Sequence, residues 1–196
     1  MARYYRRRYT RVVKPKKKWA SNLRDIDIKH STTAGNTNKG GYCQVLCVNS
    51  NEVTGSTATA PTPTIIKTGN YKVQCDCLFT ATAAESPNME LVLYIMYLPE
   101  GVFTDVQIPS MNYTTLKGIV TKHPEWILAW RQFDSGHFLT QNPMNVERVQ
   151  FSSRLKRNLN SGDSVCAVLL AIVDKDDANI TRLECHGVCQ FWTCSN

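Results

Sequence analysis

Met89-Glu-Leu-Val-Leu-Tyr-Ile-Met-Tyr-Leu98 is an almost wholly apolar stretch, and this pattern predicts a strand that is buried on both faces. Val165-Cys-Ala-Val-Leu-Leu-Ala-Ile-Val173 is the longest uninterrupted apolar run of the chain and is predicted as a second strand. A membrane-spanning helix needs about 20 apolar residues, so we expect no segment to cross a bilayer.

Six further stretches alternate or are rich in β-branched and aromatic residues, and turn signals separate them. They are Asp25–His30, Tyr42–Val48, Tyr71–Phe79, Trp126–Phe133, Val146–Leu155 and Glu184–Thr193. Pro124 is expected to start a strand, Asn158–Asp163 to form a tight turn between two strands, and Ser110–Thr121 to form a helix capped by Ser110.

These elements predict an all-β fold: a single eight-stranded jelly-roll sandwich with long loops, one short helix and a basic N-terminal arm. The first strand candidate is the weakest, and a strand within residues 50–68 is the alternative. We expect residues 1–20 to form the arm and residues 21–196 the folded domain.

The positive charge of the chain is concentrated at its start. Residues 1–18 hold nine of the 23 basic residues and no acid, which leaves 14 basic against 16 acidic residues, a balance of about −2, in the body. A run of like charges repels itself and cannot bury a core, so we expect the arm to stay unfolded until it meets a counter-charge. The nine are Arg3, Arg6, Arg7, Arg8, Arg11, Lys14, Lys16, Lys17 and Lys18.

The chemistry of the arm predicts binding to nucleic acid. Arginine pairs with phosphate through a planar fork, and Tyr4, Tyr5 and Tyr9 can stack on unpaired bases. Trp19 is expected either to stack in the same way or to anchor the arm to the body. The basic clusters are also typical of a nuclear import signal, formed by Arg6, Arg7, Arg8, Lys14, Lys16, Lys17 and Lys18. The basic, aromatic N-terminus lacks the apolar segment of a secretory signal, so we expect the chain to remain inside the cell.

Several candidate sites lie in the body. Arg154, Lys156 and Arg157 form a second basic patch, which is either a solvated strand end or a further contact with the nucleic-acid backbone. In the stretch from residue 126, Trp126, Leu128 and Trp130 are expected to share one strand face and Ile127 and Ala129 the other, with part of one face covered by a neighbouring subunit.

The eight cysteines are Cys43, Cys47, Cys75, Cys77, Cys166, Cys185, Cys189 and Cys194. Spacings of two or four residues place the members of Cys43/Cys47, Cys75/Cys77 and Cys185/Cys189 on one sheet face each. Buried thiols are the favoured interpretation, with disulfides and a metal site as alternatives.

Catalysis has little support in the sequence, because no nucleophile lies in a recognisable turn and no Gly-rich phosphate loop is present. We therefore expect no enzyme, no catalytic residue, no cofactor and no bound metal.

Four stretches carry a resemblance to a known family, and they are Met1–Tyr9, Tyr94–Gly101, His123–Asp134 and Phe151–Asp163. They resemble segments of the capsid proteins of circovirus-like viruses, which have circular, Rep-encoding single-stranded DNA genomes. The likeness covers the arm and most of the body. It implies a T=1 icosahedral shell of 60 subunits, DNA packaged through the arm, and import into the host nucleus before the chain enters the virion. It gives no role to the eight cysteines.

The partners that the resemblance implies are further copies of the chain, the viral single-stranded DNA, host nuclear import receptors and an unidentified host cell-surface receptor, with no membrane. The alternative is a nuclear protein that binds single-stranded nucleic acid without assembling. Only the resemblance favours DNA over RNA.

Overall fold

The computed structural model describes residues 18–31, 39–49, 65–81, 88–102, 113–134, 144–174 and 181–195. Their strands are β1 (Ala20–Ser31), β2 (Lys39–Val48), β3 (Ile66–Ala81), β4 (Asn88–Leu98), β5 (Ile127–Asp134), β6 (Met144–Leu159), β7 (Ser164–Asp174) and β8 (Thr181–Ser195). An α-helix, α1 (Tyr113–Lys122), and a single 3-10 turn, η1 (Pro124–Trp126), lie between β4 and β5.

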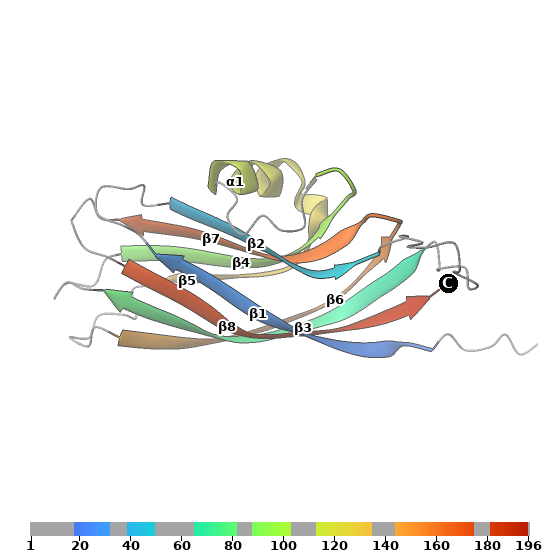
Figure 1. Ribbon diagram of the computed structural model, residues 1–196, viewed down its shortest axis with the longest axis horizontal. Helices are drawn as coiled ribbons and strands as arrows, with labels where there is room; N and C mark the ends of the chain where they lie inside the picture. The colour runs from blue at the N-terminus through green and yellow to red at the C-terminus, as the bar shows by residue number, and fades with distance from the viewer. Residues whose placement is uncertain are drawn as a thin grey trace, which may run out of the picture.

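The strands form two antiparallel four-stranded sheets that pack face to face (Figure 1). The strand orders are β1-β8-β3-β6 and β2-β7-β4-β5, and we call the two sheets the 1-8-3-6 sheet and the 2-7-4-5 sheet. Successive strands alternate between the two sheets except for β4 and β5, which are neighbours in the 2-7-4-5 sheet, and these two strand orders are the topology of a jelly roll. The predicted eight-stranded jelly roll is therefore confirmed, and each predicted strand corresponds to an observed one.

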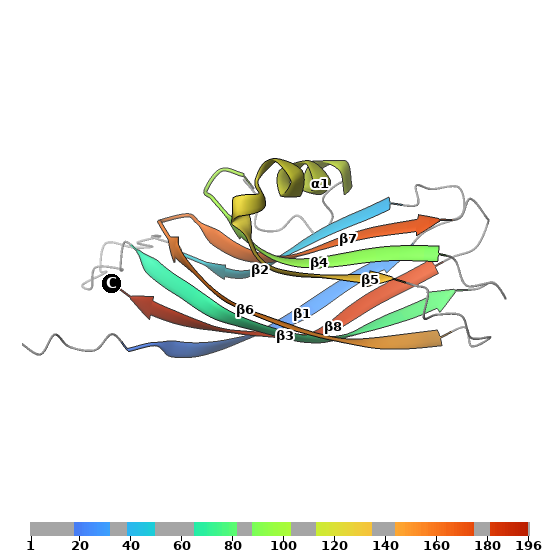
Figure 2. The same ribbon diagram turned by 180° about the vertical axis from the view of Figure 1, so that it is seen from behind.

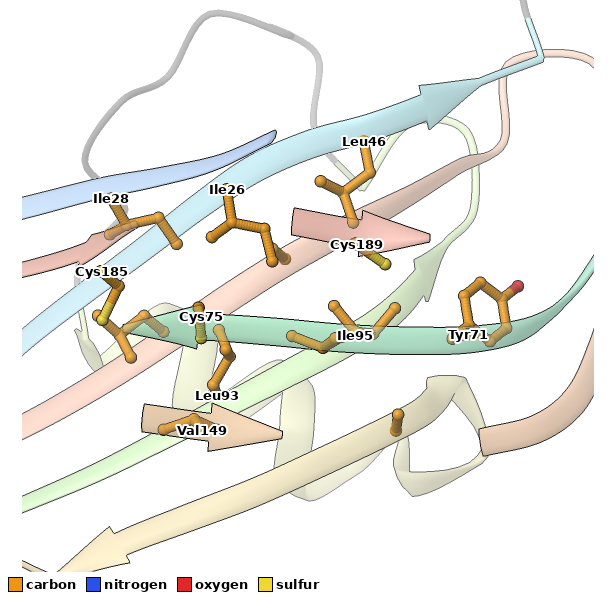
Figure 3. Packing of buried hydrophobic residues seen from close by; sticks show 14 of the residues in the cluster. Ile26, Ile28, Leu46, Tyr71, Cys75, Leu93, Ile95, Val149, Cys185 and Cys189 are labelled. Carbon is orange, nitrogen blue, oxygen red and sulfur yellow. The ribbon is translucent and has the colours of Figure 1, made fainter. Parts of the chain in front are cut away.

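The main core lies between the two sheets (Figure 3). On β3 the side chains of Tyr71, Val73 and Cys75 point inward and are buried, whereas Lys72 and Gln74 are exposed. Leu93 and Ile95 of β4 contribute to the core from the opposite sheet. Burial of such side chains stabilises the fold by about 1.5–3 kcal/mol each, which makes the sandwich core the main source of stability.

A second apolar layer covers the outer face of the 2-7-4-5 sheet. Leu116 and Val120 of α1 are buried against Tyr94, Met96 and Val168 of the sheet. Both faces of β4 and β7 are therefore covered, which explains their nearly continuous apolar sequences.

The outer face of the 1-8-3-6 sheet differs, because no other described element lies over it (Figures 1 and 2). This uncovered face extends from β1 across β8 and β3 to β6, the opposite edge strand of the sheet. Among the described residues, no helix is long and apolar enough to cross a membrane.

Two bulges overturn predicted face assignments. On β5, Ala129 pairs with Ile95 and Ile127 with Met96, so Leu128 is an extra residue. Leu128 and Ala129 therefore both enter the main core, and Trp130 lies on the opposite face from Leu128. A one-residue insertion of this kind reverses the facing of the residues beyond it.

The bulge on β2 has the same consequence for Cys43 and Cys47. The register shifts between Val45 and Cys47, which places Cys43 against the layer below α1 and Cys47 against the main core. The prediction that these two cysteines share a face is wrong, whereas Cys75/Cys77 and Cys185/Cys189 do share the inner face of their strands.

The predicted strand start at Pro124 is also wrong. Pro124 occupies the first position of η1, where its fixed φ suits a helical turn, and β5 begins at Ile127. His123 is non-helical, as the residue before a proline is expected to be. The turn after β6 is confirmed, while the predicted N-cap Ser110 and residues 50–64 lie outside the described residues.

Candidate nucleic-acid interface

The outer face of the 1-8-3-6 sheet is organised in rows of paired residues that run across β6, β3, β8 and β1. From the end at which β1 begins, row one is Lys156, Gly69, Trp192 and Ser21; row two is Ser152, Lys72, Gln190 and Leu23; row three is Gln150, Gln74, Val188 and Asp25; row four is Arg148, Asp76, His186 and Asp27. We call rows one and two, with Lys18 and Trp19, the near end, and row four, with Lys29 and Glu184, the far end.

Two lysines of the near end lie over tryptophan rings. The Nζ of Lys72 is 5.5 Å from the ring centroid of Trp192, and the Nζ of Lys156 is 5.5 Å from that of Trp19. The absent side chain of Gly69 leaves room for the Lys156 stem, because a Cβ there would lie 2.8 Å from Lys156 Cγ. Trp19 precedes β1 and Lys156 lies on β6, so this contact joins the two edge strands of the sheet. Trp19 thus contacts the body, as one of its two predicted roles requires.

A shallow hollow of about 430 Å³ lies in rows two and three. Its apolar part is formed by Leu23 and Val188, and Leu23 is 60% exposed. The polar side chains around it are Lys72, Gln74, Gln150, Ser152 and Gln190. The hollow therefore combines an apolar surface with amide groups that both donate and accept hydrogen bonds.

The charged groups of the far end are paired with one another. His186 Nδ1 is 3.0 Å from Asp27 Oδ1, and its Nε2 is 2.9 Å from Glu184 Oε2. Arg148 Nε donates to Asp76 Oδ1 at 2.9 Å, and Lys29 Nζ is 3.7 Å from Asp27. The far end consequently presents little unbalanced charge to a ligand.

The predicted patch of three cations is divided by the structure. Arg154 and Lys156 are exposed, whereas Arg157 is half-buried with its guanidinium carbon 4.1 Å from the centroid of the Tyr97 ring. Arg157 thus contacts the other sheet and is separated from the Lys156–Trp19 contact.

Tyr97, whose ring lies under Arg157, also contacts Asp163, a buried carboxylate that fastens the turn between β6 and β7. Asp163 accepts hydrogen bonds from Tyr97 Oη at 2.8 Å, from the Asn160 amide at 2.8 Å and from the Glu100 amide at 3.1 Å. Burial and then the hydrogen bond to Asp163 raise the pKa of Tyr97, so the phenol keeps its proton. This network makes the turn a rigid support for the near end.

Of the arm residues predicted to bind nucleic acid, only Lys18 lies within the described part of the chain, and it is exposed. The others lie outside it: Arg3, Tyr4, Tyr5, Arg6, Arg7, Arg8, Tyr9, Arg11, Lys14, Lys16 and Lys17. Their contacts with nucleic acid stay predictions.

Sequence reasoning missed Lys72, Trp192 and the hollow. Lys72 and Gln190 belong to two stretches that are predicted as strands, but their proximity depends on pairing between β3 and β8, more than a hundred residues apart. The available signal was a basic residue, Lys72, and an aromatic residue, Trp192, at outward positions of two predicted strands. It indicates a contact only when the register between these two strands is known.

All eight cysteines lie in described strands, and none forms a disulfide. Six are buried, which confirms the predicted buried thiols there, while Cys43 and Cys47 are half-buried. The Sγ atoms of Cys77 and Cys185 are 3.0 Å apart across the β3–β8 pair. Within the described ranges, no group of three or more His, Cys, Asp or Glu side chains is placed to hold a metal ion.

Comparisons with known proteins give distant likenesses. No family model and no curated protein sequence matches the chain. Among solved structures, dimeric latent PorU from Porphyromonas gingivalis is 10% identical with a TM-score of 0.32, over 89% of this chain but only 13% of PorU. The decameric BFDV capsid protein is 6% identical with a TM-score of 0.28, over 91% of this chain and 100% of that one. The Mud crab tombus-like virus structure is 13% identical with a TM-score of 0.28, over 93% and 95%. Likenesses at these scores assign no function.

Proposed function

We propose that this chain is a viral capsid subunit that self-assembles into a T=1 icosahedral shell of 60 copies and packages circular single-stranded DNA through its N-terminal arm. The observation that carries the proposal is the separation of charge: nine basic residues without an acid in residues 1–18, joined to a jelly-roll body with a balance of about −2. The resemblance of four stretches to circovirus-like capsid proteins supports the same function.

The charges suit a closed shell around a polyanion. Sixty arms with nine cations each bring about 540 positive charges into the shell, and each can neutralise one phosphate. The nearly neutral body lets subunits pack side by side without strong mutual repulsion. Binding to backbone charge in this way does not depend on the nucleotide sequence.

The two open sides of the sandwich, at β1–β2 and at β5–β6, differ in the groups that their edge strands expose, and we propose that the β5–β6 side contacts other copies. At the β1–β2 side, the Gln44 side chain accepts from the Asp27 amide and donates to the Asp25 carbonyl, and Arg24 donates to the Leu46 carbonyl. These bonds occupy polar groups of the edge strands, which limits pairing with another chain.

The β5–β6 side instead exposes large apolar side chains. Trp130, Val146 and Leu155 are each more than half exposed, and Trp130 stacks on Tyr94 with ring centroids 6.4 Å apart. Large apolar groups on edge strands are typical of surfaces that contact a partner. We propose that part of the contact between subunits forms here.

The proposal includes import of the chain into the host nucleus before it is assembled into the virion. The cluster Lys14–Lys18 and the preceding arginines would bind host import receptors, and another surface of the assembled particle would bind a host cell receptor. No enzymatic step is required of this chain.

Electron microscopy of the purified full-length chain with circular single-stranded DNA tests the proposal. We expect closed particles at moderate salt that contain DNA protected from nuclease. A variant lacking residues 1–18 should keep the folded body, as judged by circular dichroism, but should lose the protected DNA.

A homogeneous monomer or dimer that binds DNA at every salt and protein concentration would contradict the capsid function. It would favour the alternative, a nuclear protein that coats single-stranded nucleic acid without assembling. Loss of folding on deletion of residues 1–18 would contradict the division between arm and body.

A further inference from the structure

We propose that the near end is a second binding site for single-stranded nucleic acid, in which bases stack on Trp19 and Trp192 and a nucleotide lies in the adjoining hollow. The inference deepens the proposed function, because it depends on a nucleic-acid partner but assigns part of the binding to the folded body. It concerns contacts with bases, whereas the cations of the arm contact phosphates.

The first support is the pairing of each tryptophan with a lysine. A base that stacks on Trp192 brings its phosphate within reach of Lys72, whose ammonium already lies 5.5 Å from the ring centroid. Lys156 has the same relation to Trp19. Alternating aromatic and basic groups are characteristic of surfaces that bind single strands, since every base has a face that can stack.

The second support is the composition of the hollow. Leu23 and Val188 give it an apolar surface, and the amides of Gln74, Gln150 and Gln190 surround this surface. Amides can both donate to and accept from the edge of an unpaired base. Lys72 belongs to the hollow and also lies over Trp192, so the hollow and the stacking surface are continuous.

The third support is charge complementarity. Lys18, Lys72, Lys156 and Arg154 are basic, and along the paired rows of the described sheet the first acidic residue is Asp25, in row three. The nine cations of the arm precede Trp19 directly, so a strand held by the arm is delivered to this end of the sheet. A polyanion with bases fits these features better than a polyanion without them.

The test compares full-length chains for binding to oligo(dT) and to an abasic oligonucleotide of the same length, about 16 nucleotides. The measurement is made at about 0.5 M salt, which shortens the range of exposed charges to a few ångströms and leaves stacking in place. We expect the natural chain to prefer oligo(dT) about tenfold or more. The double variant Trp19→Leu with Trp192→Leu should reduce this preference to within about twofold.

Tyr113→Leu is the matched control, because Tyr113 of α1 also lies under a lysine, with Lys39 Nζ 5.9 Å from its ring centroid, but on the side of the other sheet, and it should leave the preference unchanged. If the double variant loses its fold, Lys72→Gln with Arg148→Gln as control replaces it. Lys72→Gln should lower the slope of log affinity against log salt by about one, and Arg148→Gln should not.

Three results would overturn the proposal: a natural chain without preference for bases, a preference that survives loss of both tryptophans, or a preference abolished only by replacing Tyr4, Tyr5 and Tyr9 with Leu. Electron microscopy of the same variants separates this outcome from failure of the capsid function. DNA-filled particles with no effect of the tryptophans would overturn only the second site, whereas a tryptophan-dependent preference without particles would overturn only the capsid.

Discussion

The near and far ends of the 1-8-3-6 sheet are built from the same four strands, yet the basic side chains of the two ends have different partners. At the far end His186, Arg148 and Lys29 each lie within 4 Å of a carboxylate. At the near end Lys72 and Lys156 lie over tryptophan rings, which attract an ammonium without cancelling its charge. The register of the strands, and not the amino-acid composition of the face, therefore determines which of its basic side chains can bind an external anion.

The largest expected effect comes from Gly187, which lies between the two ends on β8. A Cβ at this position would lie 2.3 Å from the Gln74 carbonyl oxygen and 2.4 Å from Cys75 Cα, both backbone atoms of β3. Gly187→Ala must therefore separate β8 from β3, and we expect it to lower the free energy of unfolding by about 3 kcal/mol or more. Urea denaturation measures the loss. If the near and far ends belong to one cooperative sheet, they should unfold together in a single transition.

Gly118→Ala is the matched control, because nothing lies within 4 Å of a Cβ at this position of α1. It should stabilise the chain by up to about 1 kcal/mol, since alanine restricts the unfolded chain and favours a helix. A Gly187→Ala variant as stable as the natural chain would mean that β3 and β8 do not approach as described.

Alkaline pH should weaken the core that both ends share. Burial raises the pKa of Cys189 to about 12, and a hydrogen bond to Cys77 together with burial raises the pKa of Cys75. Above pH 9 the unfolded chain loses thiol protons that the folded chain keeps, so stability is complete below about pH 9 and falls as pH rises toward 12. Between pH 8 and pH 10 we expect a loss of roughly 1 kcal/mol for each of the two thiols.

The measurement compares urea midpoints at pH 8 and pH 10 for the natural chain and for Cys75→Ala with Cys189→Ala. The variant should be less stable at pH 8 because of the lost packing, but it should change less with pH. Equal pH dependence in the two chains would contradict the assignment to these thiols.

Sequence reasoning found the strands because each burial pattern leaves a different signature. β4 and β7 are covered on both faces and read as continuous apolar runs, whereas β3 alternates because Lys72 and Gln74 face outward. The first five residues of β1, Ala20–Arg24, were missed, because exposed Leu23 breaks the alternation there.

The candidate site was less accessible to such reasoning. Extra residues at Leu46 and Leu128 reverse the facing of their neighbours, and no local pattern marks them. The Lys72–Trp192 contact requires the β3–β8 register, which depends on packing across the whole sheet. The arm stays a prediction from charge alone, because residues 1–17 lie outside the described part of the chain.

The third prediction concerns the support of the near end alone. Asp163→Ala removes the acceptor of the Tyr97 hydroxyl and of the Asn160 and Glu100 amides. Because the Tyr97 hydroxyl stays buried and the two amides stay partly buried without their acceptor, we expect a loss of about 2 kcal/mol in the free energy of unfolding. Tyr97→Phe removes one of the three bonds and should cost about 1 kcal/mol. An Asp163→Ala variant less affected than Tyr97→Phe would show that the turn is not fastened by the carboxylate.

The smallest effect is expected at the far end. Arg148 and Asp76 form an ion pair at 2.9 Å, but their side chains are 66% and 47% exposed, so water screens the attraction. Arg148→Ala should change the free energy of unfolding by no more than about 0.5 kcal/mol, and added salt should reduce this difference further. Urea denaturation at low and high salt measures both. A loss above about 1 kcal/mol that salt does not reduce would mean that the ion pairs of the far end stabilise the sheet. The contrast between a charge-balanced far end and a near end that binds a ligand would then no longer explain how the basic residues are distributed over this face.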